Sequence, residues 1–155
     1  MKFVMWGAGA VTLVLISWAI AGAETTKSAN LFPYEDPKAV AAGEVIYGDY
    51  CASCHGANLE GQENWRGGLD DNGLTLAPPH NETGHTWHHP DMQLFMITKH
   101  GTAALVGGDY KSAMIGFGDS LSDEEILNVM AFIKSTWPPE LIDAHNGINA
   151  QAAQQ

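Results

Sequence analysis

The sequence predicts an all-α fold with few helices and long loops. Three segments carry helix signals: residues 36–51, residues 90–99, and a stretch that begins after Ser122. Strand signals are almost absent, and residues 56–89 are rich in Gly, Asn, Pro and His without a clear period. A loop of that length is uncommon in a compact domain unless something else orders it. A large apolar cofactor in the middle of the helices would do so.

The first 23 residues take a large share of the apolar side chains. No charged residue lies between Phe3 and Ala23, Lys2 precedes this run, and the small residues 21–23 close it. These features are typical of a secretory signal peptide, although the run also has the roughly 20 residues that span a bilayer. We expect a signal peptide over residues 1–23, cleaved after Ala23, or alternatively an uncleaved membrane anchor. Both place the remaining chain outside the cytoplasm.

The chain is acidic, with 18 Asp and Glu against 7 Lys and Arg and a net charge of −11 at pH 7. Nucleic acid is excluded as a partner, because two polyanions repel each other. A protein partner with a basic docking patch would be attracted to such a surface. The alternative is that the charge only keeps an exported protein soluble.

The first helix follows a polar, aperiodic stretch at residues 24–35, which is expected to be a linker. Asp36 has the position of the N-cap and Pro37 that of the first helical residue, and the helix is expected to extend to Cys51. One domain is expected over residues 36–140.

The second helix is expected over residues 90–99, because Pro90 provides a starting residue and Gly101 lies just past the end. Residues 101–120, which follow it, are rich in glycine and are expected to form a loop.

The third helix has the clearest signals. Ser122 and Glu125 have capping-box spacing, and apolar residues follow at helical intervals until the prolines at 138–139 end the helix. Residues 141–155 are polar and rich in Ala and Gln, so a frayed helix or a disordered tail is expected.

The only cysteines of the chain, Cys51 and Cys54, form the motif CASCH with His55. A redox dithiol of the thioredoxin kind would follow a strand in an α/β pattern, whereas this motif follows a helix. A structural zinc site wants four ligands, commonly two such pairs, and the chain has no second CxxC. In a c-type haem attachment site, two thiols on one helical turn bond the porphyrin vinyl groups, and the following histidine reaches the iron. We expect one covalent haem c, with zinc or dithiol chemistry as the alternatives.

Several stretches of the chain are similar to class I mono-haem c-type cytochromes of the exported proteobacterial kind. AAGEVIYGDYCASCHG resembles their first helix and haem motif, and SAMIGFGDSLSDEEILNVMAFIKSTWPPE resembles their methionine loop and final helix. NLEGQENWRGG and APPHNETGHTWHHPD resemble stretches that lie between these two in such proteins. The similarity covers residues 36–140 and implies a small class I cytochrome c fold, with helices packed around one haem. It also implies a close crossing of the first and last helices at Gly43, with Tyr47 and Phe132 nearby.

The second axial ligand has several candidates, which are Met92, Met96, Met114, Met130 and the histidines outside the motif. Met130 lies on the apolar face of the third helix, and Met92 and Met96 lie one turn apart on the second, positions more typical of packing. Met114 lies in a glycine-bounded loop and matches the ligand position of the family, although Ile115 replaces the proline that usually follows. We expect Met114 to ligate the iron, with a histidine or an open site as alternatives.

Further residues are candidates for contacts with the haem. In the family, the axial histidine donates its other N–H to a carbonyl of a proline-containing loop, and Pro78 is the matching residue; a plain turn is the alternative. Arg66, the only arginine, follows Trp65, and both could bind a haem propionate. The alternative is a surface arginine beside a core tryptophan. Trp87 is a further candidate.

Four histidines lie within ten residues, at His80, His85, His88 and His89. Such a cluster can bind copper, zinc or nickel. In the alternative, which the resemblance favours, His89 caps the second helix and the others line a loop at the haem edge.

The resemblance implies a one-electron carrier in a periplasmic respiratory or other redox chain, with redox proteins as partners, and not an enzyme on its own. Two alternatives stay open. One is a haem c subunit of a larger membrane oxidoreductase, attached through residues 3–23. The other is a gas-binding or peroxidatic haem protein with an open distal site.

Overall fold

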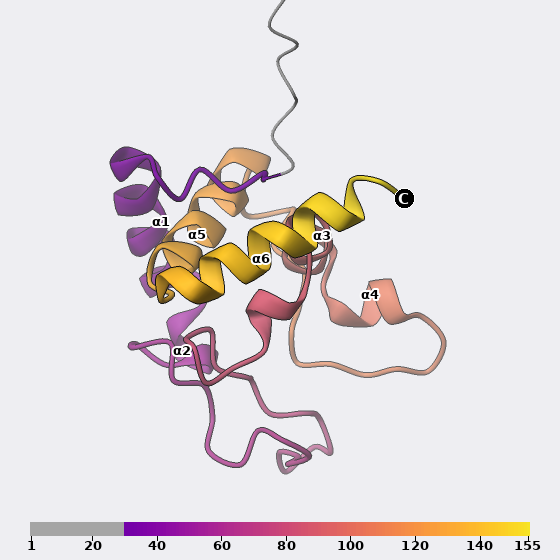
Figure 1. The fold of residues 1–155 in the computed structure, drawn as a ribbon. Coiled ribbons are helices and arrows are strands. Elements are labelled where there is room, and N and C mark those ends of the chain that lie inside the picture. The colour runs from indigo at the N-terminus through magenta and orange to yellow at the C-terminus, as the bar shows by residue number, and fades with distance from the viewer. Residues whose placement is uncertain (1–29) are drawn as a thin grey trace, which may run out of the picture.

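A computed structural model describes residues 30–155 of the chain (Figure 1). Its helices are α1 (Pro37–Tyr50), α2 (Ala52–His55), the 3-10 turn η1 (Thr86–His88), α3 (Asp91–His100), α4 (Thr102–Val106), α5 (Asp123–Ser135) and α6 (Pro139–Ala152). Within residues 30–155 the only β structure is a pair of isolated bridges, so the all-α prediction is confirmed. No helix in this range is long and apolar enough to cross a bilayer. The expected signal peptide or anchor at 1–23 and the linker residues 24–29 lie outside the described residues.

Local signals determine where the two main helices begin. The Asp36 side chain caps α1 by accepting a hydrogen bond from the Lys38 backbone N–H, and Pro37 is the first helical residue. Before α5, Ser122 and Glu125 form a capping box, in which each side chain accepts a hydrogen bond from the backbone N–H of the other residue. Both predicted helix starts are confirmed.

Helices α1 and α5 lie side by side (Figure 1), and Gly43 on α1 lies directly against the backbone of α5. A β-carbon at this position would overlap the backbone carbonyl of Asn128 on α5 and would lie 3.0 Å from the Phe132 β-carbon. One turn farther along α1, the Tyr47 ring lies 5.4 Å from the Phe132 ring. The close crossing expected at Gly43, with Tyr47 and Phe132 beside it, is therefore present.

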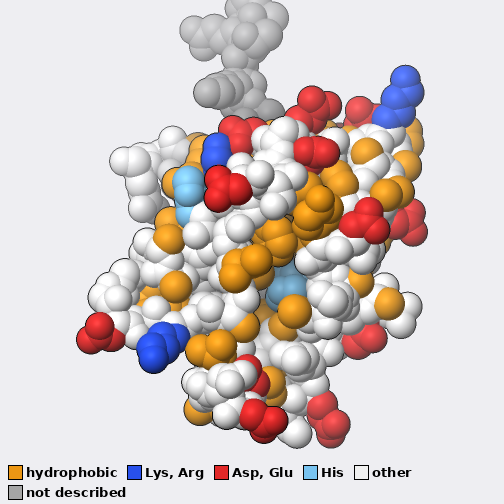
Figure 2. Space-filling view, turned by 180° about the vertical axis from the view of Figure 1, so that it is seen from behind, with side chains coloured by type: hydrophobic (Ala, Val, Ile, Leu, Met, Phe, Trp, Pro, Cys, Tyr) orange, Lys and Arg blue, Asp and Glu red, His pale blue; other side chains and the backbone are white. Residues whose placement is uncertain are grey.

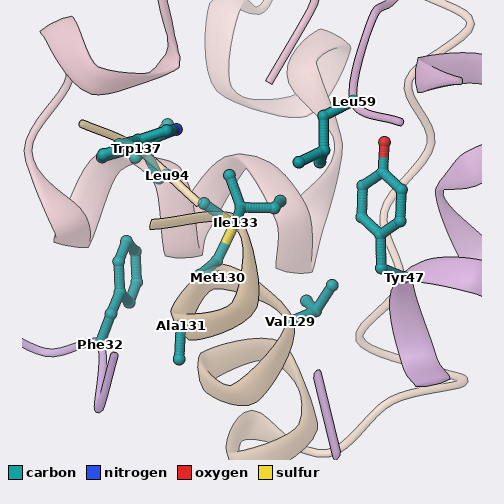
Figure 3. Packing of buried hydrophobic residues seen from close by; sticks show 9 residues of the cluster. All are labelled: Phe32, Tyr47, Leu59, Leu94, Val129, Met130, Ala131, Ile133 and Trp137. Atoms are coloured by element: carbon teal, nitrogen blue, oxygen red, sulfur yellow. The ribbon is translucent and has the colours of Figure 1, made fainter. Parts of the chain in front are cut away.

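The hydrophobic core forms around one face of α5 (Figure 3). Figure 3 shows Met130 between two groups of side chains, with Phe32 and Trp137 on one side and Tyr47 and Leu59 on the other. Met130 is only 4% exposed, which agrees with its predicted place in the core. The core thus joins the segment before α1, the loop after α2 and the segment after α5.

The long loops agree only in part with their predictions. Residues 56–85 contain turns and one isolated bridge, as the aperiodic sequence indicates, and η1 follows. The glycine-rich stretch at 101–120 begins instead with the short helix α4, bounded by Gly101 and Gly107. Its five residues are too few for a periodic sequence signal.

The C-terminal segment differs from its prediction. The sequence predicts a frayed helix or a disordered tail over 141–155, whereas the structure contains the regular helix α6 from Pro139 to Ala152. Its fully buried residues are the polar His145 and Asn149, one turn apart. Leu141 and Ile142 pack against the core from the first turn, so the apolar part of the buried face is short. The division into a domain at 36–140 and a tail stays a prediction.

A buried polar network joins α6 to the start of α3. Asp91 accepts hydrogen bonds from the backbone N–H groups of Leu31 and Phe32 at 2.6 and 3.2 Å. His145 Nε2 lies 3.3 Å from an Asp91 carboxylate oxygen, and the Asp91 backbone N–H donates to the Asn149 side chain at 2.8 Å. Asp91 therefore connects the segment before α1 through its carboxylate and α6 through its backbone N–H.

Lys134 brings a cation into the same region. Its side chain is fully buried, its Nζ donates to Asn146 Oδ1 at 2.7 Å, and it lies 4.4 Å from the centre of the Tyr34 ring. Burial lowers the pKa of Lys134, whereas the negative charge of Asp91 raises it.

Acid is expected to weaken this fold through His145. Burial lowers the pKa of His145 below its usual 6.5 and Lys134 lowers it further, whereas Asp91 acts in the opposite direction. At pH values between the pKa of His145 in the folded chain and its higher pKa in the unfolded chain, the unfolded chain binds more protons than the folded chain. The free energy of unfolding should therefore fall as the pH drops below about 6.5, by up to about 1.4 kcal/mol per pH unit for this group. Urea unfolding at a series of pH values measures the slope, and His145→Gln should flatten it. Equal slopes in the two proteins would rule out this contribution.

Candidate functional site

The two cysteines lie at the junction of α1 and α2. Cys51 is the C-cap residue of α1 and the N-cap residue of α2. Its backbone carbonyl accepts a hydrogen bond from the His55 N–H at 2.9 Å. Both thiols are free; Cys51 is half-buried and Cys54 is exposed. One helical turn therefore carries both thiols and the histidine, which is the arrangement that covalent attachment of a porphyrin needs.

The Cys51 thiol lacks the lowered pKa of a redox-active cysteine. Burial raises its pKa to about 11, and the neighbouring Cys54 adds to the shift. A redox dithiol acts through a thiolate whose pKa is lowered towards neutrality. The environment of Cys51 thus gives no support to the dithiol alternative.

His55 is held by the loop that the sequence indicated. Its ring is buried, and its Nδ1 lies 2.8 Å from the backbone carbonyl of Pro78. Because a carbonyl only accepts, Nδ1 must carry the proton, which leaves the lone pair on Nε2 available to a metal ion. Burial lowers the pKa of His55, which favours this neutral form, although the bond to Pro78 acts in the opposite direction. The expected hydrogen bond is present; the role of Pro78 at a haem stays a prediction.

Backbone hydrogen bonds fix the position of the Pro78 carbonyl. The Gln62 N–H donates to the Ala77 carbonyl at 2.9 Å, and the Ala77 N–H donates to the Gln62 side chain at 2.6 Å. Gly61, at φ +69°, lies directly against the backbone of Pro79, where a β-carbon would overlap it. The contacts of Gly61 and Gln62 with residues 77–79 thus hold the Pro78 carbonyl beside His55.

His80 is the neighbour of His55 that the sequence did not reveal. The two imidazole rings are stacked, with centroids 4.0 Å apart and an angle of 23° between their planes. The sequence associated His80 only with the histidine cluster. Its position two residues after Pro78, the predicted partner of His55, was the one available signal.

Met114 lies in a loop that is anchored on the end of α3. Its carbonyl accepts a hydrogen bond from the Thr102 N–H at 3.2 Å, the next residue pairs with Gly101 in an isolated bridge, and the Phe117 N–H donates to Thr98 at 3.0 Å. The Met114 side chain is half-buried. The geometry makes Met114 a loop methionine with a fixed backbone, and its ligation of an iron stays a prediction.

The other methionines divide into a surface residue, a half-buried residue and a core residue. Met92 is 57% exposed, so the packing role that its helical position suggests is not seen. Met96 is half-buried on α3, and Met130 is buried, with its sulfur 3.8 Å from the Thr98 hydroxyl.

Arg66 and Trp65 form a surface stack. The Arg66 guanidinium lies 4.5 Å from the centre of the Trp65 ring and donates a hydrogen bond to the Thr83 carbonyl at 3.3 Å. The Trp65 ring also stacks with the His85 ring, at 5.2 Å between ring centres. The binding of a propionate by Arg66 and Trp65 stays a prediction.

Trp87 offers a donor without a protein acceptor. Its Nε1 is buried and has no hydrogen-bond partner within the described residues, and its side chain packs against the core. An indole N–H only donates, so its acceptor would be a water molecule or a bound group. A haem propionate is an acceptor of the required kind, so this buried donor is compatible with the group.

The histidine cluster is spread over several contacts. His85 and His89 meet edge to face at 5.3 Å between ring centres, and His88 lies against Trp87. Among residues 30–155 no group of three or more His, Cys, Asp or Glu side chains is arranged to hold a metal ion. His89 does not cap α3, since Pro90 occupies the N-cap position.

Hydrophobic side chains gather on one face of the molecule. Figure 2 shows them across the middle of that face, around a recessed histidine. A planar, largely apolar group with polar edges suits such a surface.

Comparison with known families decides the class of the protein. The family model for cytochrome c matches residues 40–137, which is more than half of the chain. The chain belongs to the cytochrome c family. No curated protein and no solved structure shows significant similarity to it. This cytochrome has its CASCH motif within the matched range, which is consistent with the binding of haem c and with electron transport, the activity typical of the family.

Proposed function

We propose that this cytochrome is a one-electron carrier in a periplasmic respiratory or other redox chain, with one haem c bonded to Cys51 and Cys54 and ligated by His55 and Met114. The observation that carries the proposal is the CASCH turn, on which the Pro78 carbonyl fixes the His55 ring with Nε2 free to ligate. When bound, the haem supplies the Fe(III)/Fe(II) couple.

The protein would contribute orientation and a dry environment. Pro78 holds the proton on Nδ1 of His55, which keeps Nε2 a neutral donor in both oxidation states. The core side chains Tyr47 and Leu59 exclude water beside the motif, since they are 2% and 6% exposed. Exclusion of water and a thioether ligand at Met114 both raise a reduction potential.

The location and the partners rest on sequence features. The apolar run at 3–23 supports export, either with cleavage after Ala23 or as an anchor. The net charge of −11 supports redox partners with a basic docking patch, which would be attracted electrostatically. An intact N-terminus in the mature protein would favour the alternative of a subunit of a membrane oxidoreductase.

Met114→Ala is expected to abolish the weak long-wavelength absorption band that methionine-to-iron charge transfer gives in ferric cytochromes. The thioether is the source of that band, so its removal also should lower the reduction potential. Met92→Ala is the matched control, because Met92 is exposed on α3, and its spectrum should equal that of the unaltered protein.

Other spectra would point elsewhere. If the band is absent from the unaltered ferric protein and added azide or carbon monoxide binds at once, the distal site is open and the gas-binding or peroxidatic alternative leads. If the band persists in Met114→Ala, another methionine is the ligand and the assignment of Met114 is wrong.

A further inference from the structure

The position of His80 is fixed at three points. Its backbone N–H donates to the Leu59 carbonyl at 2.9 Å, and its carbonyl accepts the indole N–H of Trp137 at 2.7 Å. Its ring Nδ1 lies 2.8 Å from the Thr86 hydroxyl. The residue cannot shift or turn without breaking at least one of these bonds.

The Thr86 hydroxyl anchors the His80 ring. Thr86 is 4% exposed, and its Oγ1 lies 2.8 Å from His80 Nδ1 and 3.5 Å from the Pro79 carbonyl. A hydroxyl can donate to Nδ1 or accept from it, so the bond forms with either tautomer of the ring. This chain of bonds holds the His80 ring in one plane.

That plane lies against His55. The two rings are 4.0 Å apart and 23° from parallel, and the Tyr47 ring meets His80 edge-on at 6.4 Å. The Pro78 carbonyl contacts the same His55 ring at its Nδ1 edge. His55 is thus restrained at its edge by one residue of the loop and across its face by another.

We propose that His80 is a positioning residue, whose stacked ring sets the rotation of the His55 ring about the axis through Nε2. This inference rests on the proposed function, in which His55 is an axial ligand. An aliphatic side chain at position 80 would fill the space but would present no flat face and make no bond to Thr86, so His55 would be free to rotate farther.

Proton NMR of the ferric protein tests the proposal, because the order and spread of the hyperfine-shifted haem methyl signals depend on the orientation of the axial imidazole. His80→Leu is expected to change that pattern most. His80→Phe keeps a flat ring but loses the bond to Thr86, so its pattern should lie between those of His80→Leu and the unaltered protein. Thr86→Val, which loses the bond to Nδ1 but keeps the shape, should shift the pattern in the direction of His80→Leu. Glu82→Gln, at an exposed side chain of the same loop, is the control and should change nothing.

The outcomes separate the inference from the function on which it rests. A His80→Leu protein that carries haem and shows the unaltered methyl pattern would overturn the inference, as would a His80→Phe protein as altered as His80→Leu. If His80→Leu does not fold, Thr86→Val decides, since an unchanged pattern there would also overturn the inference. An unaltered protein that acquires no haem at all would instead contradict the proposed function.

Discussion

Gly43→Ala is expected to destabilise the protein by about 3 kcal/mol or more, at the upper end of the effects of overpacking. The added β-carbon would overlap the Asn128 carbonyl, and this neighbour is backbone inside a helix that cannot move aside locally. Relief requires α1 and α5 to separate, which would loosen the contact between Tyr47 and Phe132 as well. Urea unfolding followed by far-UV circular dichroism measures the loss.

Gly48→Ala is the matched control for this substitution. Gly48 lies on the same helix, α1, and a β-carbon there meets no atom within 4 Å. Alanine should therefore leave the protein unchanged or stabilise it by up to about 1 kcal/mol, through helix propensity. Equal effects of the two substitutions would show that the crossing of α1 and α5 is not as close as described.

Asp91→Ala is expected to cost about 3–5 kcal/mol, the range for breaking a buried charged network by removal of one partner. The carboxylate is 1% exposed and accepts two backbone N–H groups from the segment before α1. Its negative charge raises the pKa values of the buried Lys134 and His145, and for Lys134 it acts more strongly than Glu35. Its loss leaves the two donors without a partner and removes the larger of the two negative charges that stabilise the Lys134 cation. Denaturant unfolding measures the cost.

Asp123→Ala provides the comparison at the surface. Asp123 forms an ion pair with Lys99 at 2.6 Å, but its side chain is 61% exposed. Exposed pairs contribute roughly 0–1 kcal/mol, so the two aspartates should differ severalfold in effect. Similar values would contradict the account of Asp91 as the carboxylate that holds the segment before α1. A Lys134→Met substitution should recover part of the loss in Asp91→Ala, because it removes the cation that has lost the larger of its two stabilising charges.

The features that the sequence predicted depend on neighbours in the chain or on a shared motif. The caps at Asp36 and Ser122 are contacts over two or three residues, so the residue types alone indicate them. The close crossing at Gly43 and the bond from His55 to Pro78 followed from resemblance to a family. The bond from His55 to Pro78 joins residues 23 positions apart, which is too far for a local sequence pattern to indicate.

The features that the sequence did not predict are long-range and polar. Helix α6 buries His145 and Asn149, whose partners His89 and Asp91 lie 56 and 58 residues away. Neither hydrophobic periodicity nor local propensity encodes such a pairing. The stack of His80 on His55 is missed for the same reason, since a histidine in a loop resembles a surface residue until its partners are known.

The candidate site also has a local part that the sequence predicts and a part that depends on the fold. The CASCH motif is local and can be recognised in the sequence, whereas the lack of a hydrogen-bond partner for the Trp87 indole is known only from the folded structure. Arg66, singled out because it is the only arginine, lies on Trp65 at the surface.

The covalent bonding of one haem to Cys51 and Cys54 can be measured as the intact mass of the protein, exported from cells that contain the haem-attachment machinery and then denatured in acid. Every chain should carry the added mass of one haem, and the double variant Cys51→Ser, Cys54→Ser should retain none after denaturation. An unmodified polypeptide mass, with both thiols open to alkylation, would rule out the covalent haem.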